Sequence, residues 1–344
     1  MDTFERGLKT SIDPILLIGG AGVVGRWTVK QLRAAYPGVP LLIGGRDIAK
    51  ARQAAEETGN AKGIAIDLKM PGLGLESQPV SAVAIFFTDE TTAALHFAQS
   101  RKVPYISISP GIHEIGPEIA AFMHRPDAGA VVLGTEWLVG ATTIPALEFA
   151  KEFSKVQDIT ISALLDEQDA AGPAANADLE RQTNTIPLTL TRRNGAYLWR
   201  MGEEVKARFH AVDGTEMEAS ALSPHDVVAL ATVTGAPNVQ FNLAVGVSSS
   251  RRTGGKMSTE IIIELSGEDH KGNPLKTRRA VVHPEGQMPL TGLGVAMLLE
   301  RLTGLDGNLK TPAGMYFPYQ LLDSTTYFDR LEKSGGIIMK LEVM

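Results

Sequence analysis

Cysteine is absent from this chain of 344 residues, which excludes disulfides, thiolate metal sites and cysteine nucleophiles. No apolar run approaches the roughly 18 residues of a membrane span. The charged, polar stretch Met1 to Asp13 lacks the apolar core of a signal peptide. The net charge of −6 and the pI near 5.7 also lack the basic excess of proteins that bind nucleic acid or anionic membranes. We therefore expect a cytoplasmic protein with no nucleic-acid partner, no membrane partner and no metal.

The first feature that is present is a glycine-rich turn between a buried strand and a helix. Ile15 to Ile18 is a short apolar run, and Arg26 to Leu32 continues as an amphipathic helix. Between them Gly20, Gly22 and Gly25 form a G-x-G-x-x-G pattern, which permits a tight turn, close approach of a pyrophosphate and close helix packing. The N–H groups at the helix N-terminus favour phosphate. We expect a dinucleotide to bind at Gly20, Ala21, Gly22, Val23, Val24 and Gly25.

The end of the next strand, Pro40 to Ile43, indicates which dinucleotide binds. An NAD site normally places Asp or Glu about 20 residues past the glycines, on the ribose 2′-hydroxyl. Here Gly45 and Arg46 follow the strand, and a guanidinium can pair with a 2′-phosphate and stack on adenine. We interpret Asp47 as the N-cap of the next helix, and Lys50 is either a second phosphate contact or solvated surface. The pattern favours NADP(H), with NADPH preferred over NADH.

Strands and helices alternate over residues 1–150, which predicts a Rossmann domain with a doubly wound parallel sheet. The expected strands are Ile15–Ile18, Pro40–Ile43, Ala61–Leu68, Ala82–Thr88, Pro104–Ser109 and Ala130–Leu133. The expected helices after the first are Asp47–Thr58, Thr91–Arg101 and Glu114–His124. Ligands of such sheets bind beyond the carboxyl ends of the strands. Thr88 and Ser107 are therefore further candidates for cofactor contacts.

Residues 151–310 predict an α+β domain with a mainly antiparallel sheet, which we expect to bind the substrate and to dimerise. Hairpin turns are indicated by Arg193-Asn194-Gly195 and by Asp213-Gly214. The expected strands are Ile159–Leu165, Ile186–Leu190, Ala207–Val212, Val239–Val247, Ser258–Leu265 and Leu275–Val282. One strong helix, Gly292 to Leu302, follows Thr291 as its expected N-cap. Residues 311–344 form a C-terminal tail whose return to the first domain stays open.

Two segments of the second domain carry less specific signals. Gln168 to Asp178 is either a loop over the site or a surface loop. Arg192, Arg193 and Arg200 flank the first hairpin, and Arg251-Arg252 follows a serine run. These arginines are either an anchor for a carboxylate or phosphate or ordinary solvated surface.

Hydride transfer from a nicotinamide requires a group that exchanges one proton. His113 follows the fifth strand, near the expected nicotinamide position, and Glu114 beside it can tune its pKa. Glu136 lies past the sixth strand next to Trp137, an apolar neighbour that can raise a carboxyl pKa. His113 and Glu136 are the catalytic candidates, with helix capping or ordinary surface as the alternative for each.

The chain resembles the saccharopine dehydrogenase-like oxidoreductases. The resemblance lies in the stretch Ile15 to Gly25, in the strand end Gly45-Arg46 and in the strand Val103 to Ser109. It implies a Rossmann domain followed by an antiparallel sheet domain. It also implies an enzyme that interconverts an imine and an amine, often on amino-acid-derived substrates.

These features predict an NADP(H)-dependent oxidoreductase that reduces a C=N or C=O bond of a small molecule, or catalyses the reverse oxidation, as a homodimer. Two alternatives differ in their use of the dinucleotide. A non-catalytic regulator or redox sensor would bind it without turnover. An assembly protein with a Rossmann scaffold would not bind it.

Overall fold

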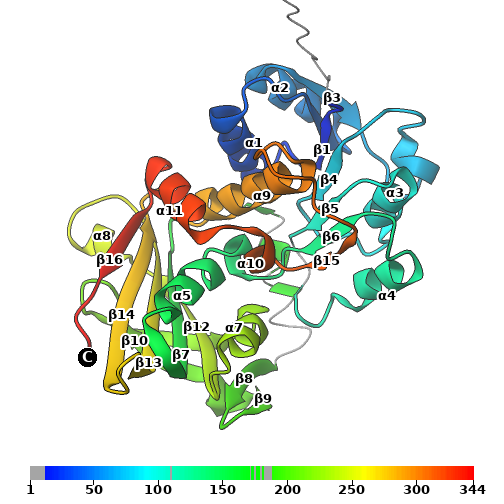
Figure 1. Cartoon of the computed structure of the whole chain (residues 1–344). Helices are drawn as coiled ribbons and strands as arrows, with labels where there is room; N and C mark the ends of the chain where they lie inside the picture. Colours follow the sequence, from blue (N-terminus) through cyan, green and yellow to red (C-terminus); the bar gives the residue numbers. More distant parts are fainter. Residues whose placement is uncertain (1–11, 109–110, 171, 174–175, 179, 182–187) are drawn as a thin grey trace, which may run out of the picture.

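The computed structural model describes residues 12–108, 111–170, 172–173, 176–178, 180–181 and 188–344. These residues form two sheets with helices packed against them (Figure 1). Sheet A consists of β1 (Ile15–Ile18), β2 (Leu41–Gly45), β3 (Ala61–Ala65), β4 (Ala82–Ile85), β5 (Tyr105–Ser107), β6 (Ala130–Leu133) and β15 (Gly314–Tyr316). Its helices are α1 (Val23–Ala35), α2 (Ile48–Thr58), α3 (Ala93–Arg101) and α4 (Gly116–His124), and a short 3₁₀ turn, η1, spans Pro71–Gly74.

Sheet A is parallel throughout, in the order β15-β6-β5-β4-β1-β2-β3. The chain builds outward from β1 through β2 and β3, then crosses to β4 on the other side, so the strand order reverses at β1. All four residues of β1 are buried, as expected for a parallel strand covered on both faces. The predicted doubly wound Rossmann sheet is confirmed, and the C-terminal tail adds β15 at its edge.

Sheet B is mixed and mostly antiparallel, as predicted. Its strands are β7 (Phe153–Asp166), β8 (Thr189–Arg193), β9 (Ala196–Arg200), β10 (Lys206–His210), β11 (Glu216–Leu222), β12 (Asn238–Gly246), β13 (Thr259–Asp269), β14 (Pro274–His283) and β16 (Ile337–Lys340). The main path runs β10-β11-β12-β7-β13-β14-β16, with the β8–β9 hairpin attached to β12. β7 and β12 pair in parallel.

The helices of the second half are α5 (Thr143–Ala150), α7 (Asp226–Thr234), α8 (Ser249–Arg252), α9 (Met288–Thr303), α10 (Pro318–Leu321) and α11 (Ser324–Lys333). Two 3₁₀ turns, η2 (Trp137–Val139) and η3 (Gly202–Val205), complete the elements. No helix in the described ranges combines the length and the apolar character needed to cross a membrane.

Helix α9 takes part in a hydrophobic cluster on each of the two sheets. Leu290 and Leu293 pack with sheet B, whereas Leu298 and Leu302 pack with sheet A. Figure 1 shows α9 between the elements of the two sheets. A Cβ on Gly292 would lie 2.6 Å from Cβ of Trp27 in α1, so glycine is required there for the two helices to approach.

Two sequence expectations for the second half need correction or fall outside the described residues. Thr291 is not an N-cap, because α9 starts at Met288 and the Thr291 hydroxyl donates to the Gln287 carbonyl inside the helix. Pro289 occupies the first turn, where a helix tolerates proline. The expected strand Ile186–Leu190 lies partly outside the described residues, which contain β8 from Thr189 onward.

Candidate functional site

The glycine turn sits where β1 ends and α1 begins, at the strand where the order of sheet A reverses. A Cβ on Gly25 would lie 2.5 Å from Cα of Gly20, so only glycine lets α1 pack this closely on the turn. Gly22 is the N-cap of α1 and offers no side-chain hydrogen bond, and the first turn carries no acidic residue. The N–H groups of this helix end are therefore open to an anion and reinforced by the helix dipole.

Arg46 follows the carboxyl end of β2, whose Gly44 carbonyl accepts the Gly19 N–H of the glycine turn. A Cβ on Gly45 would meet nothing within 4 Å, and Arg46 is exposed and takes part in no ion pair among the residues that the structure describes. Asp47 accepts hydrogen bonds from the N–H groups of Ala49 (3.0 Å) and Lys50 (3.1 Å). The prediction that Asp47 caps α2 is confirmed, so its carboxylate is already engaged.

Ser107, at the end of β5, directs its hydroxyl toward α4. The Ser107 hydroxyl donates to one oxygen of the Glu118 carboxylate and the Tyr105 hydroxyl to the other, both at 2.8 Å. Burial raises the pKa of Glu118, against the lowering effect of these two bonds. A cofactor contact of the Ser107 side chain would have to compete with Glu118. The backbone carbonyl of Ser107 accepts the Gly134 N–H (2.7 Å).

Thr88, past the end of β4, is held from the second half of the chain by Arg181. Arg181 Nη2 donates to the Thr88 hydroxyl (2.8 Å), and Arg181 Nη1 binds Asp178 (2.8 Å). The same guanidinium forms an ion pair with Glu114, and this hydrogen bond lowers the pKa of Glu114. The connection between β7 and β8 therefore reaches the carboxyl ends of sheet A. Nothing in the sequence signals this, because Thr88 and Arg181 are 93 residues apart.

A second contact brings the same connection to the glycine turn. A Cβ on Gly172 would lie 2.9 Å from the Val23 side chain. Within the expected loop Gln168–Asp178, Gly172 thus lies against the start of α1 and Asp178 beside Thr88, at the candidate dinucleotide site. Residues 171 and 174–175 of that loop are outside the described ranges.

His113 and Glu136, the catalytic candidates, occupy different environments. His113 is exposed in the turn before α4, and its ring lies 4.7 Å from that of Trp199. Glu136 is buried past the end of β6, where its Oε2 accepts the Thr143 hydroxyl (2.6 Å). Burial, reinforced by the neighbouring Asp226, raises the pKa of Glu136 well above its usual range. The direction matches the expectation from sequence.

Asp226 and His225 continue this buried polar cluster at the start of α7. Asp226 accepts the Trp137 N–H (2.7 Å) and the Thr142 hydroxyl, which ties α7 to the segment after β6. The His225 ring stacks on Phe317 at 4.0 Å. Burial raises the pKa of Asp226 to about 6 and lowers that of His225 to about 4. At neutral pH His225 is therefore an uncharged imidazole.

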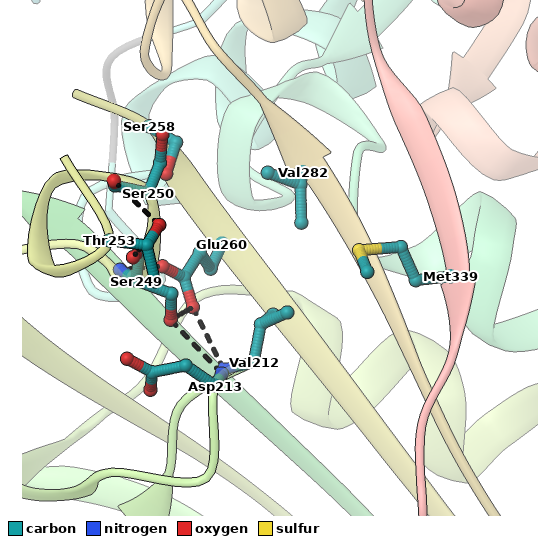
Figure 2. Close-up of a pocket in the computed structure, with 9 residues that line it drawn as sticks. All are labelled: Val212, Asp213, Ser249, Ser250, Thr253, Ser258, Glu260, Val282 and Met339. Carbon is teal, nitrogen blue, oxygen red and sulfur yellow. Dashed lines mark hydrogen bonds between the residues drawn. The ribbon is translucent and has the colours of Figure 1, made fainter. Parts of the chain in front are cut away.

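A separate pocket of about 270 Å³ lies in the second half, at α8 and the turn after β10 (Figure 2). Its Glu260 carboxylate accepts the N–H groups of Val212 (3.0 Å) and Ser249 (2.6 Å), so it stabilises the loops around it. The expectation of an anion anchor at Arg251-Arg252 fails, because Arg251 pairs with Asp166 and Arg252 with Asp213. Carboxylates already neutralise both guanidinium groups.

No family model matches this chain, and no curated protein matches it. Among solved structures, it is similar to saccharopine dehydrogenase (L-Glu forming) from Saccharomyces cerevisiae. That match has a TM-score of 0.66 and 12% identity, and it covers 96% of this chain and 100% of that chain. The myo-inositol dehydrogenase from Lactobacillus casei matches with a TM-score of 0.47 and 11% identity over 97% of this chain and 98% of that chain. At 12% identity, the first likeness shows a shared fold.

Proposed function

We propose that this protein is an NADP(H)-dependent oxidoreductase that reduces a C=N or C=O bond of a small molecule, or catalyses the reverse oxidation. One observation carries the proposal. The uncapped N-terminus of α1 lies at the strand where sheet A reverses its order, behind a turn in which Gly25 packs on Gly20. An open helix N-terminus at such a reversal point suits a pyrophosphate.

Preference for NADPH rests on the end of β2. Arg46 is exposed and without an ion pair among the described residues, while the nearest carboxylate, Asp47, is engaged as a helix cap. A guanidinium binds a 2′-phosphate through charge-assisted hydrogen bonds. The ribose 2′-hydroxyl of NADH would find no free carboxylate from Asp47.

An amino-acid-derived substrate with a C=N bond is the favoured class. The neighbour with the higher of the two TM-scores is a saccharopine dehydrogenase, and the glycine turn and strand ends of this chain resemble the same group of enzymes. The protein would act on this small molecule in the cytoplasm.

The proton exchanged with the substrate requires a group of this chain, since the bound cofactor supplies or accepts only the hydride. We assign this role first to His113, because it is exposed and directly precedes Glu114. Glu114 pairs with Arg181, which also binds Thr88 past the end of β4. Glu136 is buried, and burial raises its pKa, which favours a supporting role as an acid past β6.

Replacing His113 with Gln should lower turnover of an imine or keto acid by about 10²-fold or more at saturating NADPH, the usual contribution of a general acid or base. The affinity for NADPH should stay unchanged. His124→Gln, at the exposed end of α4, is the matched control. Equal turnover in the two variants would remove His113 from the reaction.

Replacing Arg46 with Ala tests the cofactor assignment. We expect NADPH binding to weaken by about 1.5 to 3 kcal/mol, the worth of a charge-assisted hydrogen bond, while NADH binding changes little. Calorimetric titration of both cofactors measures the two affinities. Replacement of Arg52, an exposed arginine in the following helix α2, with Ala should leave both affinities unchanged. A uniform loss for NADPH and NADH in Arg46→Ala would contradict the 2′-phosphate assignment.

A further inference from the structure

Strand β9 exposes an unbroken apolar stretch. Tyr197, Leu198 and Trp199 are 43%, 44% and 46% exposed, and Met201 just beyond the strand is 58% exposed. Successive residues of a strand point to opposite faces, so Tyr197 and Trp199 are part-exposed on one face of β9 and Leu198 on the other. Tyr197 is contacted by Arg192 and Trp199 by His113 within the chain, and Arg200 at the end of the strand is buried. Single exposed apolar residues are ordinary, but a contiguous apolar stretch marks an interaction surface.

The outer edge of β9 is also free. Among the described strands β9 pairs with β8 alone, and Figure 1 shows this hairpin at the margin of sheet B. A free strand edge presents N–H and C=O groups that can pair with another strand. No charged side chain occupies positions 196 to 199, and Arg200, the charged residue at the end of the strand, is buried.

The hairpin turn determines which backbone groups point outward. Asn194 and Gly195 have φ of 50° and 81°, the left-handed pair of a two-residue type I′ turn between Arg193 and Ala196. The closing pair of such a turn is hydrogen-bonded, and hydrogen-bonded and non-hydrogen-bonded pairs then alternate along the strands. Tyr197 and Trp199 lie opposite Arg192 and Leu190 in non-hydrogen-bonded positions. Their N–H and C=O groups therefore point away from β8.

We propose that β9 pairs antiparallel with β9 of a second copy of this chain, with the two-fold axis at Leu198. In this register Tyr197 lies opposite Trp199 of the second copy, and Trp199 opposite its Tyr197. All the outward-pointing N–H and C=O groups of these residues then find partners, which creates a four-stranded sheet across the axis. A two-fold axis requires such a self-complementary surface.

The side chains suit the same register. Each Tyr197 ring meets a Trp199 ring on one face, and such cross-strand aromatic pairs stabilise a sheet. The two Leu198 side chains meet on the other face. The antiparallel arrangement also places the exposed Arg193 of one copy near the η3 segment of the other, where Glu203 and Glu204 are exposed. In the single chain Glu203 pairs with Lys206 at the surface, and neither Arg193 nor Glu204 has an ion pair among the described residues.

The dimer has a direct consequence for the candidate site. Trp199 already lies against His113. Tyr197 of the second copy, opposite Trp199, would therefore lie close to the pair formed by Trp199 and His113. The association itself needs no cofactor, so the dimer can be tested independently of the proposed reaction.

A single cysteine tests the register, because the natural chain contains none. Cα atoms of a non-hydrogen-bonded antiparallel pair lie about 4.5 Å apart, within the range that a disulfide bridges. Leu198→Cys should therefore form a covalent dimer rapidly under mild oxidation. Met123→Cys, at a more exposed apolar position on α4 (71%), is the matched control and should cross-link only slowly by collision. Equal cross-linking rates would overturn the proposal.

Light scattering of the untagged full chain gives the second measurement. We expect twice the chain mass of 36.8 kDa for the natural sequence and a return to the single-chain mass for Leu198→Lys, which places two ammonium groups across the axis. Circular dichroism verifies that the variant is folded. A natural chain that stays monomeric, or a Leu198→Lys variant that stays dimeric, contradicts pairing through β9, the latter by pointing to another surface.

Discussion

His225 and Asp226 are neighbours in the chain whose pKa values are shifted by burial in opposite directions. Asp226 has a pKa of about 6 in the folded protein against 3.8 ordinarily. Between these values the folded state holds the extra proton, so stability falls as the pH rises through this window. His225 has a pKa of about 4 against 6.5. Here the unfolded state holds the extra proton, so stability falls as the pH decreases from 6.5 toward 4.

We expect the two effects to oppose each other in the natural protein, and single variants should separate them. The free energy of unfolding of Asp226→Asn, measured relative to that of the natural protein, should increase as the pH rises from 4 to 7. The free energy of unfolding of His225→Asn, measured relative to that of the natural protein, should increase as the pH falls over the same range. Each change can amount to at most about 3 kcal/mol, from shifts of about two pKa units. Urea unfolding at several pH values measures both, and parallel pH dependence in the two variants would contradict the assigned burial effects.

Individual residues differ in how far the sequence could predict them. Asp47 was predictable as a cap because its hydrogen bonds run to residues two and three positions later in the chain. A raised pKa for Glu136 was predictable from its position past a strand and beside the apolar Trp137, but the contribution of Asp226 requires the fold. Arg181 carried no signal, since its partners Thr88 and Glu114 are distant in sequence and become its neighbours only through tertiary structure.

At the scale of elements, α9 connects the two halves of the molecule. Its residues enter both the sheet A core and the sheet B core, and Gly292 lets it approach α1. One hydrophobic cluster on each sheet therefore depends on residues of this helix. The two sheets should therefore unfold together rather than as independent domains.

Replacing Gly292 with Ala tests this connection. The added Cβ meets Trp27 and the Thr28 backbone at under 3 Å, and we expect a loss of about 1 to 3 kcal/mol from overpacking. Tryptophan fluorescence and circular dichroism should follow one shared unfolding transition, at lower urea than in the natural protein. Gly38→Ala, where a Cβ would meet nothing within 4 Å, is the control. Two separated transitions, or equal stability of the two variants, would contradict the bridging role of α9.

The β8–β9 hairpin and the C-terminal tail contain elements that the sequence predicts only in part. The Asn194-Gly195 turn was predictable because both residues favour positive φ. β9 itself was not, since its apolar residues do not alternate with polar ones as they do in a half-buried strand. The pairing of β15 with β6 joins segments more than 180 residues apart, and no local pattern encodes such a contact.

In the whole molecule, the parallel sheet was predictable because apolar strands and amphipathic helices alternate along the chain, and each of these patterns can be recognised within one short segment. The mixed sheet was predicted only in class, because the parallel pairing of β7 with β12 depends on the order in which distant strands assemble. The candidate site divides in the same way. The glycine turn and Arg46 come from one short segment, whereas the contacts of Arg181, Gly172 and Trp199 come from the second half of the chain.

We expect NADPH to bind at the open end of α1 and at Arg46, which has no ion pair among the described residues. Calorimetric titration of the full chain with NADPH and with NADH, side by side, tests it most directly. We expect saturable binding of one nucleotide per chain, with NADPH at least about 10-fold tighter, as expected for one charge-assisted contact. Preference for NADH would contradict the role of Arg46, and binding of neither nucleotide would mean that the glycine turn is not a pyrophosphate site.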